Sequence, residues 1–117
     1  MPALNFRKNF VPLIENGKKR QTIRPCRKDG RNPKPGQVLY LYTGMRTKGC
    51  RKIGEVLCRS VDPVTIEELH IFIGCKQLDI DEKYDLAVAD GFNYIDDFRS
   101  FFQTHHGLPF SGYLIKW

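Results

Sequence analysis

The stretch FVPLIENGKKRQTIR, residues 10–24, decides the fold of this chain because its character changes from helical to extended at a single glycine. Residues 10–16 are predicted to form a short helix with Pro12 in the first turn, where a missing N–H costs little. Gly17 is a natural residue to end that helix, since glycine readily adopts the left-handed conformation found just beyond a helix. Residues 20–24 are predicted to form a strand. A helix followed at once by a strand is therefore the first unit of the fold.

The hydrophobic pattern on either side of this unit predicts an α+β domain. Residues 37–43 are apolar on both faces, which indicates a central strand. Asn9 and Asn93 are expected to cap helices, and Asp62-Pro63 is expected to turn the chain. The order of strand, helix, several strands, two helices and strand is typical of a mixed, barrel-like sheet with flanking helices. Further strands are expected at 3–7, 52–61 and 110–117, and further helices at 81–90 and 94–106, while residues 64–80 have no clear assignment.

Length and composition favour a single domain. The chain has 117 residues, of which 41% are hydrophobic and 27% charged, so it can bury a core without disulfide or metal staples. No apolar run approaches the ~20 residues needed to cross a bilayer. The first residues lack the apolar segment of a secretory signal, so we expect a cytoplasmic protein. We also expect a monomer.

The four cysteines leave three alternatives: two disulfides, a zinc site or free thiols. The expected reducing compartment argues against disulfides. No Cys-x-x-Cys pair occurs, and the three histidines fall at no zinc spacing, which argues against a structural zinc. Free thiols are therefore favoured, and neither a metal nor a cofactor is expected. The cysteines are Cys26, Cys50, Cys58 and Cys75.

Positive charge is concentrated in the first half of the chain. Residues 1–60 hold 15 Lys and Arg against 3 Asp and Glu, a net charge of +12, whereas residues 61–117 hold 4 against 10, a net charge of −6. This asymmetry indicates a basic face that meets an anionic partner. The alternative is a solvated face whose cations pair with the acidic half. The location of the cations in turns and loops favours binding. The candidate ligand-binding residues are Lys18, Lys19, Arg20, Arg24, Arg46, Lys48, Arg51 and Lys52.

The segment that follows Gly17 carries four cations and one hydroxyl group. On a strand, Arg20, Thr22 and Arg24 would point to one face. Lys19 has the opposite parity, and it reaches the same site only if the turn after Gly17 breaks the alternation. The alternative for Lys19 is a solvated lysine in a turn, and the alternative for Thr22 is an ordinary β-branched strand residue.

Asp90 is a second candidate because it is expected at the carboxyl end of a helix. A carboxylate there opposes the helix dipole and costs about 0.3–1 kcal/mol. Nearby cations would reverse that cost, so we expect Asp90 to face the basic cluster; the alternative is a frayed, hydrated helix end. His105 and His106 are interpreted as dipole partners at the end of the last helix, without a catalytic role. Three tyrosines could stack on a base, although a place in the core is favoured for Tyr40, Tyr42 and Tyr113.

Residues 14–24, IENGKKRQTIR, resemble the helix–Gly–Lys–x–x–Thr–Ile–Arg signature of the ASCH family, which has a PUA-like fold. Three further segments resemble that family in the same order: PGQVL at 35–39, ADGF at 89–92 and SGYLIKW at 111–117. The resemblance covers nearly the whole chain. It implies one ASCH/PUA-like domain over residues 1–117, built as a small β-barrel of mixed strands with flanking helices and a cleft lined by the signature.

The resemblance implies two functions. Family members are thought to bind RNA or modified nucleosides, so RNA or a nucleoside-type ligand is the expected partner. One branch resembles an acetylcytidine amidohydrolase, whose proposed machinery corresponds here to Lys19, Thr22 and Asp90. That branch has Glu where this chain has the shorter Asp90, and Arg20-Gln21 replace small hydroxylated residues. Hydrolysis is therefore the second expectation, and an adaptor without a nucleotide ligand is the third.

The resemblance also implies a mechanism for the second function. Lys19, with its pKa lowered by Arg20 and Arg24, would take the proton of Thr22. The hydroxyl oxygen of Thr22 would then attack the acyl carbon. Asp90 would orient Lys19 or deliver the proton to the leaving nitrogen.

Overall fold

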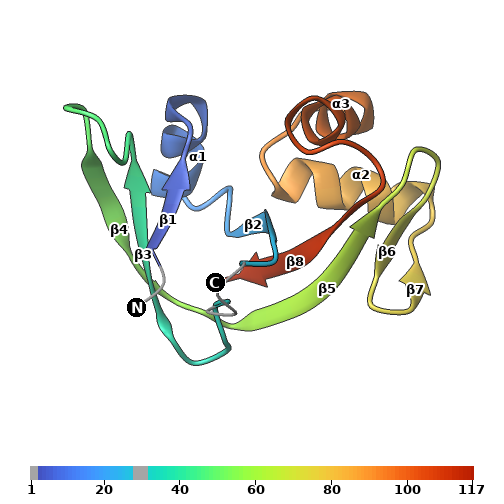
Figure 1. The fold of residues 1–117 in the computed structure, drawn as a ribbon, viewed down its shortest axis with the longest axis horizontal. Helices are drawn as coiled ribbons and strands as arrows, with labels where there is room; N and C mark the ends of the chain where they lie inside the picture. Colours follow the sequence, from blue (N-terminus) through green and yellow to red (C-terminus); the bar gives the residue numbers. More distant parts are fainter. Residues whose placement is uncertain (1–2, 28–31) are drawn as a thin grey trace.

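Two open sheets and three α-helices make up the computed structural model, which describes residues 3–27 and 32–117 (Figure 1). One sheet has the strand order β1-β3-β4, and the other has the order β2-β8-β5-β6-β7. The expected α+β class is confirmed. No closed barrel is found in the part of the chain that the structure describes.

The first sheet has β3 at its centre, as the two apolar faces of this strand predict. Leu39 and Leu41 are fully buried. The register of β3 and β4 shifts between Leu41 and Tyr42, where the antiparallel pairing is irregular. The strands are β1 (Ala3–Phe6), which runs parallel to β3, then β3 (Val38–Thr43) and β4 (Arg51–Leu57).

The second sheet is antiparallel, and its last strand in sequence, β8, lies between β2 and β5. The pairing aligns Thr22 with Ile115 and Ile115 with Val61, so the strand of the signature segment is held at the edge of this sheet. The strands are β2 (Gln21–Pro25), β5 (Ser60–Ile66), β6 (Ile71–Ile73), β7 (Lys76–Gln77) and β8 (Phe110–Lys116).

The chain passes from one sheet to the other at Cys58 and Arg59. The backbone N–H of Cys58 donates to the carbonyl of Gln37, which precedes β3 (2.8 Å), and the N–H of Arg59 donates to the carbonyl of Lys116 in β8 (2.8 Å). The strand expected over residues 52–61 is therefore wrong: it is two strands in two sheets. The apolar pattern continues through the junction because Cys58 is itself buried.

The turn expected at Asp62-Pro63 is also wrong, since both residues lie inside β5. The carbonyl of Pro63 accepts from the N–H of Gly74, so the backbone groups of Pro63 point away from β8. The paired residues of β6 begin only opposite Val64. Proline is tolerated here because its missing N–H faces a side of the strand that has no ladder partner.

The helices begin at residues other than the expected caps. Asp79 caps α2 through a reciprocal capping box with Glu82, whereas Tyr94 precedes α3 without a side-chain cap. Asn9 lies within the 3-10 turn that precedes α1, whose N-cap is Phe10, and Asn93 precedes Tyr94, so neither asparagine caps a helix. No helix within the described residues is long and apolar enough to cross a bilayer. The helical elements are a 3-10 turn at Lys8–Phe10, α1 (Val11–Glu15), α2 (Ile80–Ala89) and α3 (Ile95–His105).

The buried side chains form two clusters. One packs α2 and α3 on the second sheet and includes Phe98, Phe102 and Leu114. The other packs the first sheet and α1 and includes Leu39 and Trp117. Figure 1 shows α1 and β1 on one side of the molecule and α2 and α3 on the other, with β2 and β8 between them. The boundary between the clusters is where the candidate site lies.

Candidate functional site

The turn at Gly17 delivers Lys19 to the boundary between the two clusters. Gly17 adopts a left-handed φ of +81° directly after α1, and the N–H of Lys19 donates to the carbonyl of Leu13 at 2.9 Å. Strand β2 begins only at Gln21, so Lys19 lies outside the strand. The strict alternation of strand residues therefore does not apply to Lys19.

A cleft of about 350 Å³ lies at this boundary. It brings together the three candidate catalytic residues, Lys19, Thr22 and Asp90, and the candidate ligand-binding residue Arg24. The sequence predicted that Asp90 faces the basic residues, and that placement is confirmed. Residues that sequence reasoning did not assign to the site complete the lining: Asn5, Phe6, Arg7, Phe10, Ile23, Pro25, Phe92, Phe101, Phe102 and His106.

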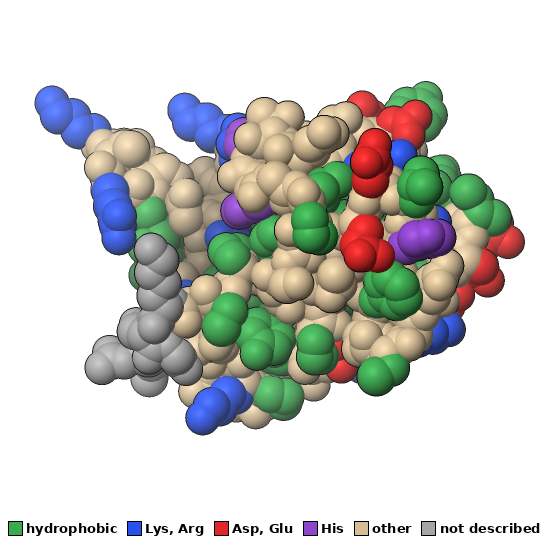
Figure 2. Space-filling model, turned by 45° about the vertical axis from the view of Figure 1, so that its right-hand side comes forward, with side chains coloured by type: hydrophobic (Ala, Val, Ile, Leu, Met, Phe, Trp, Pro, Cys, Tyr) green, Lys and Arg blue, Asp and Glu red, His purple; other side chains and the backbone are tan. Residues whose placement is uncertain are grey.

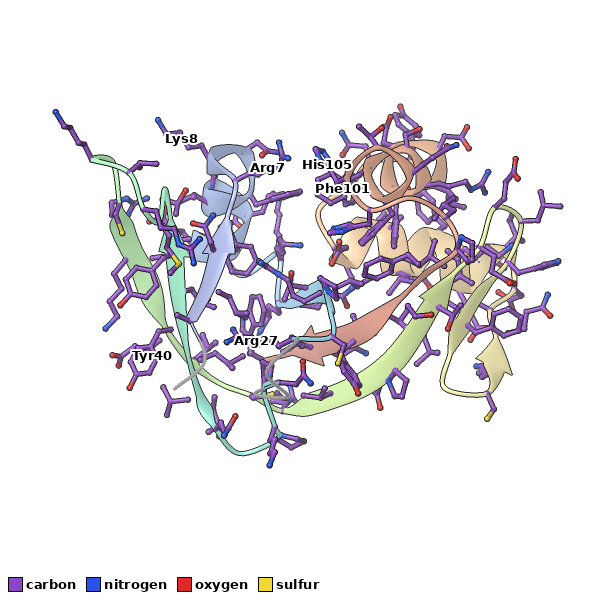
Figure 3. All side chains as sticks on the ribbon, viewed as in Figure 1. Arg7, Lys8, Arg27, Tyr40, Phe101 and His105 are labelled. Atoms are coloured by element: carbon purple, nitrogen blue, oxygen red, sulfur yellow. The ribbon has the colours of Figure 1, made fainter. Side chains whose placement is uncertain are left out.

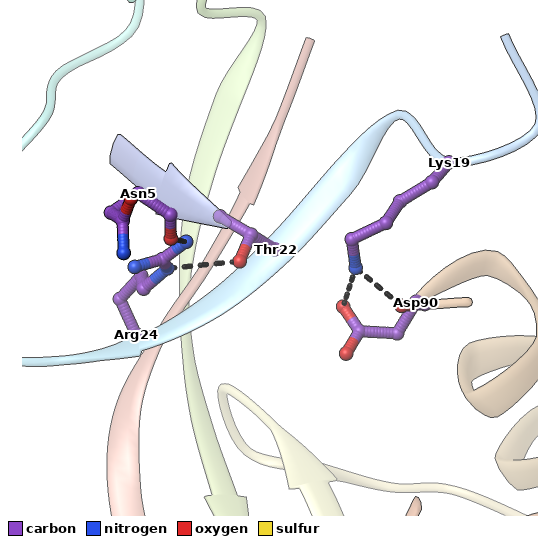
Figure 4. A network of polar contacts seen from close by, with 5 residues as sticks. All are labelled: Asn5, Lys19, Thr22, Arg24 and Asp90. Atoms are coloured by element: carbon purple, nitrogen blue, oxygen red, sulfur yellow. Dashed lines mark hydrogen bonds and ion pairs between the residues drawn. The ribbon is translucent and has the colours of Figure 1, made fainter. Parts of the chain in front are cut away.

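Lys19 and Asp90 form a buried ion pair in this cleft (Figure 4). Lys19 Nζ lies 3.3 Å from Asp90 Oδ1, and only 3% and 6% of the two side chains are exposed. The same ammonium group donates to the backbone carbonyl of Asp90 and lies 4.7 Å from the centre of the Phe10 ring. Asp90 is the C-cap residue that directly follows the last residue of α2. The shorter aspartate therefore reaches the lysine without an additional methylene.

Burial brings the pKa values of Lys19 and Asp90 closer together. It lowers the pKa of Lys19 below 10.5, with a further lowering from Arg24, while Asp90 acts in the opposite direction. It raises the pKa of Asp90 above 3.8, against the effect of Lys19. Of the two arginines expected to lower the pKa of Lys19, Arg24 does so and Arg20 does not. Both shifts favour the uncharged forms, so at a given pH a larger fraction of Lys19 is neutral and able to accept a proton than of an exposed lysine.

Arg24 positions Thr22 at the other end of the cleft. Its Nε donates to Thr22 Oγ1 at 3.0 Å, and its Nη2 donates to the carbonyl of Asn5 at 2.6 Å. The guanidinium group lies 4.8 Å from the centre of the Phe6 ring, and burial lowers the pKa of Arg24 to about 10. Thr22 thus accepts a hydrogen bond, and its own proton remains available. Among the described residues no hydrogen bond joins Thr22 to Lys19.

Phenylalanines form the walls of the cleft. In the structure, the rings of Phe92 and Phe101 lie 5.4 Å apart and both line the cleft. Helix α3 carries a third phenylalanine, Phe101, besides the two that are almost completely buried, Phe98 and Phe102. This additional ring is the sequence signal that could have indicated an aromatic wall. Of the three candidate stacking tyrosines, Tyr40, Tyr42 and Tyr113, none lines the cleft.

The mouth of the cleft is spanned by contacts between its two sides (Figure 3). Arg7, which follows β1, places Nη2 3.2 Å from Nε2 of His105 in α3. The same guanidinium group lies 5.5 Å from the centre of the Phe101 ring. His105 lies in the last turn of α3, as predicted. His106 lines the cleft, and burial lowers its pKa below 6.5.

The remaining candidate cations lie outside this cleft. Lys18 and Arg20 line a second cavity, so the shared face expected for Arg20, Thr22 and Arg24 is wrong for Arg20. The hairpin between β3 and β4 touches the edge of the cleft through one bond, from the N–H of Met45 to Asn5 Oδ1 (3.0 Å). The four cations on that hairpin do not line the cleft: Arg46, Lys48, Arg51 and Lys52.

The positive and negative halves of the sequence remain largely unpaired in three dimensions. Of the five ion pairs in residues 3–27 and 32–117, only Lys19–Asp90 joins a cation of the first sixty residues to a carboxylate of the rest. Figure 2 shows several Asp and Glu side chains gathered on one side of the molecule, and Lys and Arg side chains projecting from the opposite edge. General neutralisation of the basic residues by the acidic half is therefore wrong for the described residues.

The cysteines and other potential metal ligands do not form a site in the described part of the chain. All four cysteines are free thiols, with Cys58 buried and the others exposed. No group of three or more His, Cys, Asp or Glu side chains there could hold a metal ion. Comparisons of the chain with protein-family models, with curated proteins and with solved structures find no match.

Proposed function

We propose that the cleft binds the base of a modified nucleoside or of an RNA nucleotide. The observation that carries this proposal is the combination of phenylalanine walls with the buried polar groups of Lys19, Thr22 and Asp90. Small-molecule sites are typically concave, mostly apolar and supplied with a few fixed polar groups. The cleft, at about 350 Å³, suits a ligand of nucleoside size.

Each part of the cleft has a role in this proposal. Phe101 offers a partly exposed ring on which a base can stack. Lys19 and the hydroxyl group of Thr22 offer donors to carbonyl or ring-nitrogen acceptors of a base. Asp90 Oδ1 makes the ion pair with Lys19, and because a carboxylate can accept several hydrogen bonds, Asp90 can also accept from an exocyclic amino group.

The ASCH resemblance of residues 14–24 supports the same proposal, because Lys19, Thr22 and Arg24 of that signature all line the cleft. We extend the proposal to the architecture: the two open sheets correspond to a PUA-like barrel. The sheet-switching junction at Cys58 and Arg59, bonded to both sheets, supports this correspondence.

Calorimetric titration tests the proposal. The ligands are cytidine, acetylcytidine, uridine, adenosine and a single-stranded RNA octamer. We expect at least one nucleoside to bind and Phe101→Leu to weaken its binding about fivefold or more, since base–aromatic stacking contributes about 1–3 kcal/mol per base. Phe72→Leu is the matched control, because Phe72 is a partly buried phenylalanine of β6 outside the cleft. The proposal fails if no ligand binds, or if both variants bind as the wild type does.

A second candidate function is removal of an acyl group from an acylated cytidine-type nucleoside. The observation that favours it is that the buried Lys19–Asp90 pair and Thr22 line one cleft. Neutral Lys19 would accept the hydroxyl proton of Thr22 while Thr22 Oγ1 forms a bond to the acyl carbon. The C–N bond then breaks, and the leaving amine takes the proton from Lys19. Water hydrolyses the acyl-threonine ester and releases the acid.

Turnover of acetylcytidine, followed by chromatography of the released cytidine, tests this second function. Thr22→Val should abolish turnover and Thr22→Ser should retain part of it. The rate should rise with pH as Lys19 loses its proton, with a midpoint below 10.5, the ordinary value for lysine. Turnover by Thr22→Val would exclude Thr22 as the nucleophile.

A further inference from the structure

We propose that a second cavity, separate from the cleft, binds a phosphate group carried by an RNA strand or by a free nucleotide. This cavity has a volume of about 520 Å³ and shares no lining residue with the cleft. The polar side chains that line it come from three separate segments of the chain: Lys18, Arg20 and Gln21, then Arg59 and Ser60, then Lys116.

The strand register brings these segments together. Gln21 of β2 is paired with Lys116 of β8, and Lys116 is paired with Ser60 of β5. Residues paired directly across neighbouring strands lie on the same face of a sheet. The amide, the ammonium group and the hydroxyl group therefore form a row across three strands, and Arg59 precedes the last of them.

The cations of the cavity have no counter-charge. Lys18, Arg20, Arg59 and Lys116 form no ion pair and no side-chain hydrogen bond with any described residue. The lining contains no Asp or Glu. Four positive charges around one concavity raise the local potential and favour an anionic ligand.

Gln21 adds a buried polar side chain to the lining of the cavity. It is 5% exposed, and a side-chain hydrogen bond from Gln21 lowers the pKa of Asp90. The groups that would bind an anion are therefore the four cations, from which a phosphate oxygen can accept charge-assisted hydrogen bonds.

One feature opposes anion binding. The last residue of α2, Ala89, lines the cavity, and the carboxyl end of a helix carries about half a negative charge. Four side-chain cations exceed this partial charge several-fold. The net field in the cavity remains positive.

The segment after Gly17 separates the two cavities. Lys18, Arg20 and Gln21 line the phosphate cavity, whereas Lys19 and Thr22 line the cleft. An RNA strand that crosses this segment could place a base on one side and a phosphate on the other. The assignment to RNA rests on the proposed function of the cleft; phosphate binding by the cavity does not.

Fluorescence of Trp117 provides the assay. Trp117 is the only tryptophan of the chain, and it lines the cavity. The probes are inorganic pyrophosphate and a single-stranded RNA octamer. The test variant is Arg59→Gln/Lys116→Gln, and the control of equal charge is Lys8→Gln/Lys34→Gln, whose lysines are both exposed and lie outside both cavities.

We expect the test variant to bind pyrophosphate at least tenfold more weakly than the control. For RNA, the slope of log affinity against log salt should become shallower by about 0.7 for each phosphate group that the variant no longer neutralises. Weaker binding of both probes assigns the cavity to an RNA strand, and weaker binding of pyrophosphate alone assigns it to a free nucleotide. Equal affinities of the two double variants, both folded by circular dichroism, would overturn the proposal.

The cleft can be tested apart from the cavity with Phe101→Leu. Pyrophosphate affinity should stay unchanged in that variant, even if nucleoside binding is abolished. Failure of the cleft proposal would then leave the phosphate cavity intact. A parallel decrease of pyrophosphate binding in Phe101→Leu would count against two separate sites.

Discussion

The cleft and the phosphate cavity use the same short segment of sequence in two physically different ways. Lys19 and Arg24 face the cleft, where burial lowers the pKa of both and each has polar partners. Lys18 and Arg20 face the cavity, where they are exposed and their side chains have no partner among the described residues. Burial lowers the pKa of a cation, so that it can lose its proton more readily, whereas an exposed cation keeps its positive charge and attracts anions. Neighbouring residues can therefore have different functions: proton transfer in the cleft and anion binding in the cavity.

The largest expected effect comes from breaking the buried pair. Asp90→Ala leaves the Lys19 ammonium buried without its carboxylate, which should cost about 3–5 kcal/mol of the free energy of unfolding. Urea denaturation measures this change. Lys18→Ala, on the exposed side of the same segment, should change stability by less than about 0.5 kcal/mol. Similar losses of stability in the two variants would contradict the difference between the buried pair in the cleft and the exposed cations of the cavity.

A double-mutant cycle sharpens the same measurement. Lys19→Met/Asp90→Leu removes both charges and should recover most of the stability, because a buried ion pair can often be replaced by apolar side chains at little cost. A strictly additive result from the single and double variants would show that the two side chains do not interact.

The next largest effect is expected at Gly112 on β8. A Cβ at Gly112 would lie 2.2 Å from the carbonyl oxygen of Arg24, so Gly112→Ala must push β2 away from β8. We expect a loss of about 1–3 kcal/mol in the free energy of unfolding and weaker ligand binding in the cleft. Gly54→Ala is the control, because nothing lies within 4 Å of the added Cβ. Equal stability of the two variants would contradict this close approach.

The buried pair should also give stability a characteristic pH dependence. Above 3.8, up to the raised pKa of Asp90, the folded protein holds more protons than the unfolded chain, so the free energy of unfolding falls as pH rises. Between the lowered pKa of Lys19 and 10.5, the folded protein holds fewer protons, so stability rises with pH. Each unit of pKa shift corresponds to about 1.4 kcal/mol.

Urea unfolding of the wild type and of Lys19→Met/Asp90→Leu, from about pH 4 to about pH 10, measures this dependence. The change in the free energy of unfolding converts to a pKa shift at about 1.4 kcal/mol per unit. The difference between the two curves should show the fall and the rise. A constant difference across the whole range would mean that neither group titrates abnormally.

The smallest effect is expected on the hairpin between β3 and β4. Arg46→Gln/Lys48→Gln removes two cations that line neither cavity. Nucleoside affinity should change by less than about twofold, because exposed charges are screened by salt over about 10 Å. Calorimetric titration checks this, and a larger loss would extend the binding region to the hairpin.

Local rules predicted the elements whose signals lie close together in sequence. The helix, glycine and strand of residues 10–24 were found because Pro12 and Gly17 have strong local preferences. The meeting of Asp90 with a cation was also predictable, since a carboxylate at a helix end needs compensation. Whether Lys19 or Arg20 would be that cation depended on the backbone between Gly17 and Gln21, which strand parity does not describe.

Tertiary pairing decided the rest. The division of residues 52–61 between two sheets follows from bonds to Gln37 and Lys116, which no local pattern announces. Pro63 reads as a turn residue, and only the position of β6 makes it acceptable inside a strand. The phenylalanine walls were missed because a buried ring and a ring that lines a cleft have the same sequence pattern.

The contact between Gly91 and Phe10, at the start of α1, links the two sides of the cleft. Gly91, with φ +103°, leaves room for the Phe10 ring, which an added Cβ would approach to 2.9 Å. Asp90 directly precedes Gly91, and the backbone N–H of Lys19 donates to the carbonyl of Leu13, within the helix that Phe10 precedes. A change in the bulk of residue 10 would therefore shift acid and amine relative to each other. The size of the Phe10 side chain therefore affects the distance between the Asp90 carboxylate and the Lys19 ammonium group. Replacing Phe10 is a way to change this distance without altering any polar group.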